Sequence, residues 1–212
     1  MVKTVVCFGD SNTYGYCGDP KDCADGVRFG EAERWTGLLR KNLGEGFRIC
    51  EDGVVGRTTA FEDPMRPGMN GLADLPSVLG RYGRVDQLIL MLGTNDTKPR
   101  FGLSPEDIAG GMERLVLRAK ELPVWNTEQP EILIIAPAHI KAAGDPAMGT
   151  KSAALGQLYR ALAERHGCRF LDAEEICVFN KTDGTHLTAA SHRALAERLA
   201  DMIPQWIKNQ KN

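Results

Sequence analysis

The chain alternates short runs of consecutive apolar residues with longer stretches in which apolar residues recur every three or four positions. Five apolar runs predict β-strands, at residues 4–8, 47–51, 87–92, 131–136 and 168–171. The runs at 87–92 and 131–136 are apolar on both faces, as a strand covered by helices on both sides requires. The alternation of such strands with helices predicts an α/β fold of three layers, α/β/α, around a mostly parallel five-stranded sheet.

Apolar stripes at helical spacing predict helices between these strands. Ser104 offers an N-cap and Pro105 has the fixed φ of a first helical position, so one helix is expected to begin there. Thr188 is the expected cap of the last helix. Glycines and prolines in 57–84 and 138–150 predict long loops, the first with a short helix within 72–84. The stripes, which we assign to the core, are Ile108, Met112, Leu115 and Ala119; Trp35, Leu38, Leu39 and Leu43; Leu155, Leu158, Tyr159 and Leu162; and Leu195, Leu199, Met202 and Trp206.

Composition narrows the possible partners. With 26 Lys and Arg against 28 Asp and Glu, the net charge is −2, which argues against a nucleic-acid partner. No apolar run approaches the ~20 residues of a membrane span, so no membrane partner is expected. An N-terminal segment too short for a signal peptide, together with six cysteines, predicts reduced thiols in a cytoplasmic protein. Cys-x-x-Cys and His-Glu-x-x-His are absent, so neither a metal nor a cofactor is expected. Without repeats or linkers, residues 1–212 are expected to form one domain.

Polar residues that could carry chemistry follow the predicted strands. Ligands of parallel sheets bind beyond the carboxyl ends of the strands, and Ser11 comes directly after the first strand. Acyl transfer needs a nucleophile, a base, a group that orients the base, and donors for the oxyanion. We assign Ser11 as nucleophile and His186 as base, oriented by Asp183 three residues earlier. The backbone N–H groups of Ser11 and Gly56 and the side-chain amide of Asn95 are the expected oxyanion donors.

These blocks, in this order, resemble the SGNH (GDSL-type) hydrolase family. Ser11 matches its first block, Gly56 the second, Asn95 the third, and Asp183 with His186 the last. Further strings resemble the arylesterase/acyltransferase subgroup, namely Arg34-Trp35-Thr36-Gly37, Arg57-Thr58-Thr59 and Met91-Leu92-Gly93-Thr94-Asn95-Asp96-Thr97-Lys98. The resemblance implies a flavodoxin-like fold and metal-free hydrolysis of short-chain acetyl or aryl esters through an acyl-enzyme on Ser11. It also implies acyl transfer to alcohols or peroxide, and a homo-oligomer in which loops such as 57–84 and 138–150 narrow the entrance.

The small-molecule ester is expected to contact a set of residues near these blocks: Asn12, Tyr16, Thr94, Lys98, His139 and Thr185. Asn12 and Thr185 are polar where the family commonly has apolar residues, and Asp52 stands where many relatives have asparagine. The first two substitutions predict a more polar pocket, which makes acetylated carbohydrate an alternative substrate.

Other interpretations remain open at this level. His139 is a rival base, because it follows a strand at the same edge, although no acid lies close to it in sequence. His166 and His192 are expected at a helix end and on a helix surface, and Asp10 and Asp96 are expected to accept hydrogen bonds from backbone amides. A nucleotide-binding flavodoxin-like protein is a distant alternative, although the sequence lacks the Gly-x-Gly-x-x-Gly motif of such proteins. A catalytically silent binding module is another alternative.

Overall fold

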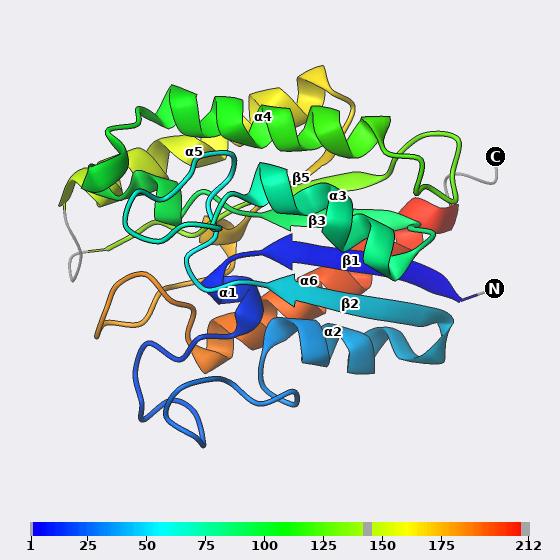
Figure 1. The fold of residues 1–212 in the computed structure, drawn as a ribbon. Coiled ribbons are helices and arrows are strands. Elements are labelled where there is room, and N and C mark those ends of the chain that lie inside the picture. The colour runs from blue at the N-terminus through cyan, green and yellow to red at the C-terminus, as the bar shows by residue number, and fades with distance from the viewer. Residues whose placement is uncertain (1, 142–145, 209–212) are drawn as a thin grey trace.

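The sheet of the protein is parallel throughout. The computed structural model describes residues 2–141 and 146–208. Its five strands are hydrogen-bonded in the order β2-β1-β3-β4-β5 (Figure 1). Their bounds are β1 (Lys3–Gly9), β2 (Phe47–Gly53), β3 (Gln87–Met91), β4 (Ile132–Ala136) and β5 (Arg169–Asp172). All five predicted strands are therefore confirmed, and their order is that of flavodoxin-like folds.

Helices cover both faces of this sheet and confirm the three-layer fold. Helices α2 and α6 pack together on one face, and α3, α4 and α5 cover the other (Figure 1). Helix bounds are α1 (Ser11–Tyr14), α2 (Trp35–Leu43), α3 (Gly71–Tyr82), α4 (Pro105–Glu121), α5 (Pro146–Arg165) and α6 (Ala189–Lys208); the 3-10 turns are η1 (Gly44–Gly46), η2 (Asn95–Thr97), η3 (Pro99–Phe101) and η4 (Ala173–Glu175).

Strand β1 shows why the core has two halves. Val6 and Phe8 pack into the cluster under α3, α4 and α5, whereas Val5 and Cys7 pack into the cluster under α2 and α6. Successive side chains of a strand point to opposite faces, so a strand between two helical layers needs apolar residues at every position. Each such side chain contributes about 1.5–3 kcal/mol to folding through its burial.

The helix ends follow the predicted signals with one exception. Ser104 and Asp107 form a reciprocal capping box at the start of α4, and Thr188 Oγ1 accepts from the Ser191 amide at 3.1 Å as the cap of α6. The short helix expected within 72–84 is α3, which begins one residue earlier. The loop prediction for 138–150 is wrong in its last part, because α5 begins at Pro146, a residue that suits a first helical turn. Residues 142–145 lie outside the described residues.

His192 is buried, contrary to the helix-surface prediction. Its Nδ1 accepts a hydrogen bond from the Trp35 backbone N–H at 3.3 Å, and its ring packs edge-on against Phe29, with 4.7 Å between ring centroids. Burial lowers the pKa of His192 to about 3, so it is a neutral core residue. His166 follows the last residue of α5, which confirms its predicted place at a helix end.

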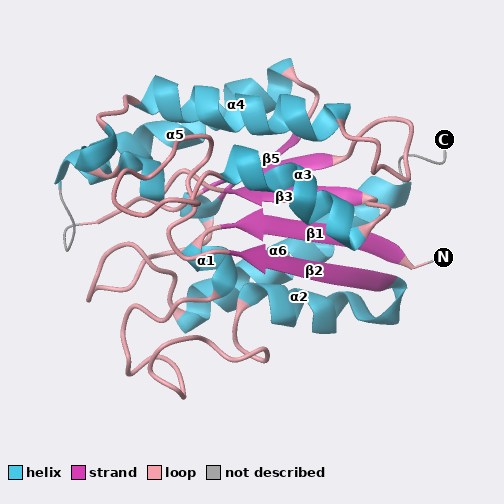
Figure 2. Cartoon of the chain, viewed as in Figure 1, coloured by secondary structure: helices cyan, strands magenta, loops and turns pink. Residues whose placement is uncertain are grey.

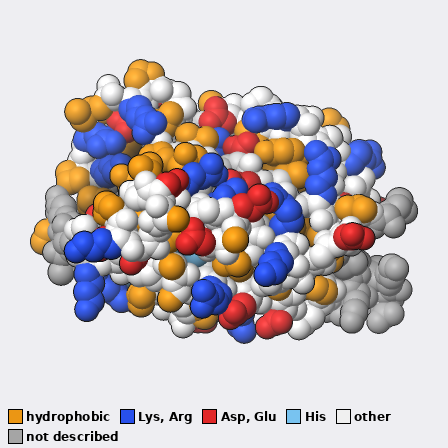
Figure 3. Space-filling model, turned by 90° about the horizontal axis from the view of Figure 1, so that it is seen from below, with side chains coloured by type: hydrophobic (Ala, Val, Ile, Leu, Met, Phe, Trp, Pro, Cys, Tyr) orange, Lys and Arg blue, Asp and Glu red, His pale blue; other side chains and the backbone are white. Residues whose placement is uncertain are grey.

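The long loops gather at the carboxyl ends of the strands (Figure 2). The chain leaves β1 toward β2 on one side of the sheet, and it leaves β3 toward β4 on the other side. The loops after β1 and β3 therefore diverge at the carboxyl edge of the strands. On the face that Figure 3 shows, basic and acidic side chains are interspersed rather than gathered by sign. Within the described residues, no helix combines the length and apolarity needed to cross a bilayer.

Candidate active site

The turn after β1 presents Ser11 at the start of α1. The Asp10 side chain accepts from the Asn12 amide at 2.9 Å, and the Asp10 carbonyl accepts from the Thr13 and Tyr14 amides at 3.1 and 2.9 Å. These hydrogen bonds occupy the backbone amides of Asn12, Thr13 and Tyr14, whereas the amide of Ser11 takes no part in them. The backbone also passes close to itself, because a Cβ on Gly9 would lie 2.0 Å from Thr13 Oγ1. Only glycine fits there, and the tight turn places the Ser11 side chain at the edge of the sheet.

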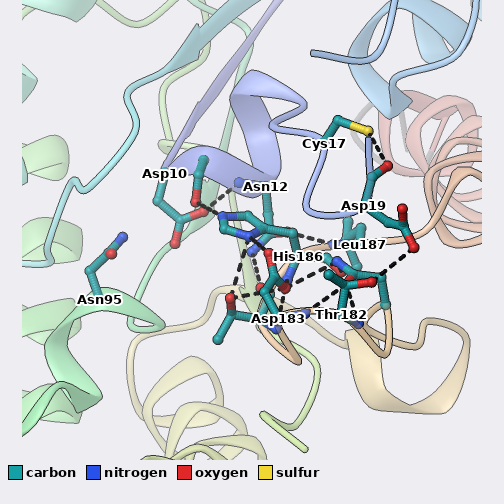
Figure 4. Close-up of polar contacts among 12 residues, drawn as sticks. Asp10, Asn12, Cys17, Asp19, Asn95, Thr182, Asp183, His186 and Leu187 are labelled. Atoms are coloured by element: carbon teal, nitrogen blue, oxygen red, sulfur yellow. Dashed lines mark hydrogen bonds and ion pairs between the residues drawn. The ribbon is translucent and has the colours of Figure 1, made fainter. Parts of the chain in front are cut away.

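Ser11, His186 and Asp183 form a continuous hydrogen-bonded chain. His186 Nε2 lies 2.9 Å from Ser11 Oγ, and His186 Nδ1 lies 2.7 Å from Asp183 Oδ2. Figure 4 shows the imidazole between the Asp10–Asn12 turn and Asp183. The Tyr16 ring packs against the imidazole, with 4.5 Å between ring centroids. This is the geometry in which an imidazole removes a proton from a hydroxyl while a carboxylate fixes its orientation.

Asp183 is held in place by its own loop. Its Oδ1 accepts from the Asn180 side chain at 3.0 Å and from the Thr185 and His186 amides at 2.9 and 3.1 Å. Burial raises the pKa of Asp183, but the hydrogen bonds from His186 and Thr185 outweigh it and leave the pKa well below its ordinary value. The carboxylate therefore stays charged and keeps the proton of the imidazole on Nδ1.

A glycine outside the matched blocks makes this arrangement possible. A Cβ on Gly18 would lie 2.1 Å from Asp183 Oδ2 and 2.3 Å from Asn180 Nδ2. The backbone of the loop after α1 thus lies directly against the carboxylate that orients His186, and no side chain fits between them.

Gly18→Ala is expected to lower kcat by ~10²-fold, because the added methyl group must displace Asp183 and tilt the imidazole. Steady-state kinetics with a short-chain ester would measure this. Gly80→Ala is the matched control, since nothing lies within 4 Å of a Cβ there. Equal activity of the two variants would contradict a role for Gly18 in placing Asp183.

Three donors converge where the oxyanion would form. In the described part of the chain, the Ser11 and Gly56 amides donate to no other protein group, and Gly56 has a φ of 94°, which favours glycine. Asn95 Nδ2 uses one hydrogen to bond the Arg57 carbonyl at 2.9 Å, and its second hydrogen remains for a ligand. Lys98 Nζ donates to Asn95 Oδ1 at 2.6 Å and so holds the amide in this orientation.

Asn95→Ala is expected to lower kcat by ~10²–10³-fold, or about 3 kcal/mol, because one oxyanion donor is lost. KM should change much less, since the charge on the oxygen develops in the transition state. The control is Asn126→Ala, which removes an amide that bonds Arg84 and Asp86 next to the start of β3. Full kcat in Asn95→Ala would remove Asn95 from the oxyanion site.

A buried ion pair joins the loops that carry these donors. Arg57 is 2% exposed, and its guanidinium donates to Asp52 Oδ1 at 2.8 Å, to the Asp52 carbonyl at 2.7 Å and to the Gly9 carbonyl at 3.1 Å. The ends of β1 and β2 are thereby tied together just below Ser11 and Gly56. Asp52, the departure noted in the second block, supplies the charge that this buried arginine needs.

Beside Ser11 lies a cavity of about 130 Å³. It is lined by Ser11, Val55, Gly56, Arg66, Thr94, Asn95, Lys98, Met148, Thr185 and His186. Three of the residues predicted to contact substrate, Thr94, Lys98 and Thr185, are therefore placed at the cavity. Val55, Arg66 and Met148 were not predicted; Val55 directly precedes Gly56 of the second block, whereas Arg66 and Met148 come from a loop and a helix start without a recognisable motif.

Asn12 has a different role from the one predicted for it. It is 3% exposed and does not line the cavity. Its Nδ2 donates to the Thr185 carbonyl at 3.2 Å, and its Oδ1 accepts from the Leu187 amide at 2.9 Å (Figure 4). Asn12 thus clamps the loop that carries His186 onto the turn that carries Ser11, and both polar atoms of its side chain take part in this clamp.

His139 and Tyr16 are also absent from the described lining of the cavity. The His139 backbone N–H donates to Glu174 Oε2 at 2.8 Å, and its Nδ1 lies 3.7 Å from Glu174 Oε1. His139 is thus tethered to η4, and it is His186 that bonds Ser11. The acid beside His139 is distant in sequence, which is why no partner could be predicted for it.

Asp10 and Asp96 accept backbone hydrogen bonds as predicted. Asp96 accepts from the Thr59 amide at 3.0 Å and from the Thr59 hydroxyl at 2.5 Å. Burial raises the pKa of each carboxyl to about 6, although hydrogen bonds from Asn12 and Thr59 favour the charged forms. In the described residues, no group of three or more His, Cys, Asp or Glu is arranged to hold a metal ion.

Comparisons with known proteins agree with this geometry. The sequence model of the GDSL-like lipase/acylhydrolase family matches residues 7–194. The structure of an aryl esterase from M. smegmatis has 35% sequence identity and a TM-score of 0.88, over 96% of this chain and 99% of that one. Est24, a carbohydrate acetylesterase from Sinorhizobium meliloti, has 33% identity and a TM-score of 0.87, over 96% and 99%. No curated protein sequence matches the chain.

The family model spans the three strand ends and the loop that meet at the cavity, and the similarity in structure extends over nearly the whole chain. The chain therefore belongs to the GDSL-like lipase/acylhydrolase family, the SGNH hydrolases.

Proposed function

We propose that this hydrolase is a serine esterase that cleaves short-chain carboxylic esters through an acyl-enzyme on Ser11. The observation that carries the proposal is the chain of contacts from Ser11 Oγ to His186 Nε2 at 2.9 Å and from His186 Nδ1 to Asp183 Oδ2 at 2.7 Å. Free donors on Gly56 and Asn95 lie at the same cavity.

In the acylation step, His186 Nε2 takes the proton of Ser11 as Oγ attacks the ester carbonyl. The carbonyl oxygen becomes an oxyanion that accepts hydrogen bonds from the Ser11 and Gly56 amides and from Asn95 Nδ2. When the carbon–oxygen bond to the alcohol breaks, His186 returns the proton to the leaving oxygen. The acyl group then remains on Ser11.

Deacylation repeats these events with water. His186 removes a proton from a water molecule, whose oxygen attacks the acyl-enzyme, and the proton passes to Ser11 Oγ as the acid leaves. An alcohol in place of water gives a new ester, and hydrogen peroxide gives a peracid. Product analysis in water–alcohol mixtures would measure how far such transfer competes with hydrolysis.

The small cavity favours a short acyl group such as acetyl. Similarity to an aryl esterase favours aryl esters as the first substrates to test, and similarity to a carbohydrate acetylesterase favours acetylated sugars as the second. Assembly into a homo-oligomer stays a prediction, which sedimentation velocity would test.

A fluorophosphonate probe tests the proposal directly, because it reacts preferentially with an activated serine. Peptide mapping should locate the label on Ser11, and pre-incubation with the probe should abolish release of 4-nitrophenol from 4-nitrophenyl acetate. A label on another residue, or full activity after complete labelling of Ser11, would contradict the proposed nucleophile.

A further inference from the structure

Two cationic side chains line the cavity beside Ser11 without a carboxylate partner. Arg66 comes from the loop between β2 and α3, and Lys98 follows η2. Among the described residues, neither forms an ion pair, whereas the neighbouring Arg57 and Arg100 are paired with Asp52 and Asp63.

Both cations lie on the oxyanion side of the site. A Cβ on Gly56 would lie 3.0 Å from Arg66 Nη1, so the guanidinium covers the glycine whose amide faces the carbonyl oxygen. Lys98 Nζ lies 2.6 Å from Asn95 Oδ1. The carboxylate of Asp63, on the same loop as Arg66, is already held by Arg100, with Nε–Oδ1 at 3.0 Å and Nη2–Oδ2 at 2.5 Å.

The surroundings of Lys98 contain charges of both signs. Burial lowers the pKa of Lys98 and so do the charges of Arg100 and Arg66, whereas those of Asp10 and Asp63 raise it, and the net shift is downward. Positive side chains beside a cavity attract anions, and an anion bound between the exposed Arg66 and the half-buried Lys98 would offset the repulsion between them. A neutral acetyl ester would give neither cation such a partner.

We propose that the cavity selects esters that carry a negatively charged group, such as a carboxylate, within reach of Arg66 and Lys98. This inference rests on the proposed esterase function. His186 must face the leaving oxygen, and the cations come from the opposite loops, so the charged group belongs on the acyl part, as in the monoester of a short dicarboxylic acid.

Two matched pairs of esters test the proposal and distinguish a charged group on the acyl part of the ester from one on the alcohol part. The first pair, ethyl hydrogen succinate and ethyl pentanoate, differs in charge on the acyl part, and ethanol release is measured. The second pair, 4-acetoxybenzoate and its methyl ester, differs in charge on the alcohol part, and acetate release is measured. The readout for each pair is the ratio of kcat/KM for the charged ester to that for the neutral one.

In the wild-type protein the ratio should fall as ionic strength rises, because added salt screens the attraction. Arg66→Gln should lower it by about tenfold, the effect of losing one charge-assisted hydrogen bond. Arg118→Gln removes the same charge from the last turn of α4, at the other end of the sheet, and should leave the ratio unchanged. Lys98→Met should slow both esters, since Lys98 also holds Asn95, and should also lower the ratio.

A ratio that is insensitive to salt and to Arg66→Gln in both pairs would overturn the anion site. Ser11 would still be labelled by the fluorophosphonate probe in that case, so the esterase proposal would stand. Absence of labelling at Ser11 would instead refute the esterase proposal. A ratio that responds only in the second pair would support the anion site and move the charged group to the alcohol part.

Discussion

Ser11→Ala is expected to lower kcat for a short-chain ester by about 10⁶-fold, the loss found when the nucleophile of a serine hydrolase triad is removed. No other group can replace it, because Ser11 Oγ is the atom that bonds His186 Nε2 at the cavity. Initial rates at saturating ester, with the purified protein at high concentration, would measure the remaining turnover.

His186→Ala should cost nearly as much, and the double variant should cost little more than either single one. The two side chains act as a unit, so their effects do not add. Folding is checked by thermal unfolding, which should change little in Ser11→Ala because only one hydroxyl is removed. Residual activity of His186→Ala above one per cent or so, well beyond the expected ~10⁻⁶, would reopen the assignment of the base. Loss of activity in His139→Ala would then identify His139 as the base.

Asp183→Asn is expected to lower kcat by about 10⁴-fold while KM changes little. An asparagine Oδ1 can still accept from the Thr185 and His186 amides, so the loop should keep its shape. The NH₂ group then faces His186 Nδ1 and needs an acceptor there. The imidazole is forced into the tautomer that carries its proton on Nε2, and it can no longer accept the proton of Ser11.

Asp201→Asn on the exposed side of α6 is the matched control for the loss of one negative charge, and it should retain wild-type kcat. Fluorophosphonate labelling adds a second readout, because Ser11 in Asp183→Asn should react far more slowly. Labelling at the wild-type rate would show that Asp183 does not control the protonation of His186.

Residues outside the lining of the cavity set the geometry on which these effects depend. Asn12 fastens the loop of His186 to the turn of Ser11, and Gly18 leaves room for Asp183. Arg57 ties the ends of β1 and β2 through Asp52 and Gly9. Three loops that are far apart in the chain are thus joined by short contacts, as a preorganised site requires.

The sequence alone was enough for the strands, the layers and the pairing of Asp183 with His186. The central strands β1, β3 and β4 are buried on both faces, so their apolar runs carry their own signal. The polar residues that follow each strand must meet at one edge, because the strands are parallel. Asp183 and His186 could be paired from sequence because they lie three residues apart in one loop.

Tertiary structure decided everything that depends on contacts between loops. Three of these contacts join segments that have no periodic pattern. They are the contact of Arg66 with Gly56, that of Gly18 with Asp183, and the hydrogen bonds of Asn12 to Thr185 and Leu187. The burial of His192 likewise depends on α2, whose Trp35 amide bonds it from a distant part of the chain. A repeating pattern records which side of an element faces the core, but it does not record which residue of another loop lies opposite. That information exists only once the order β2-β1-β3 brings the loop ends together.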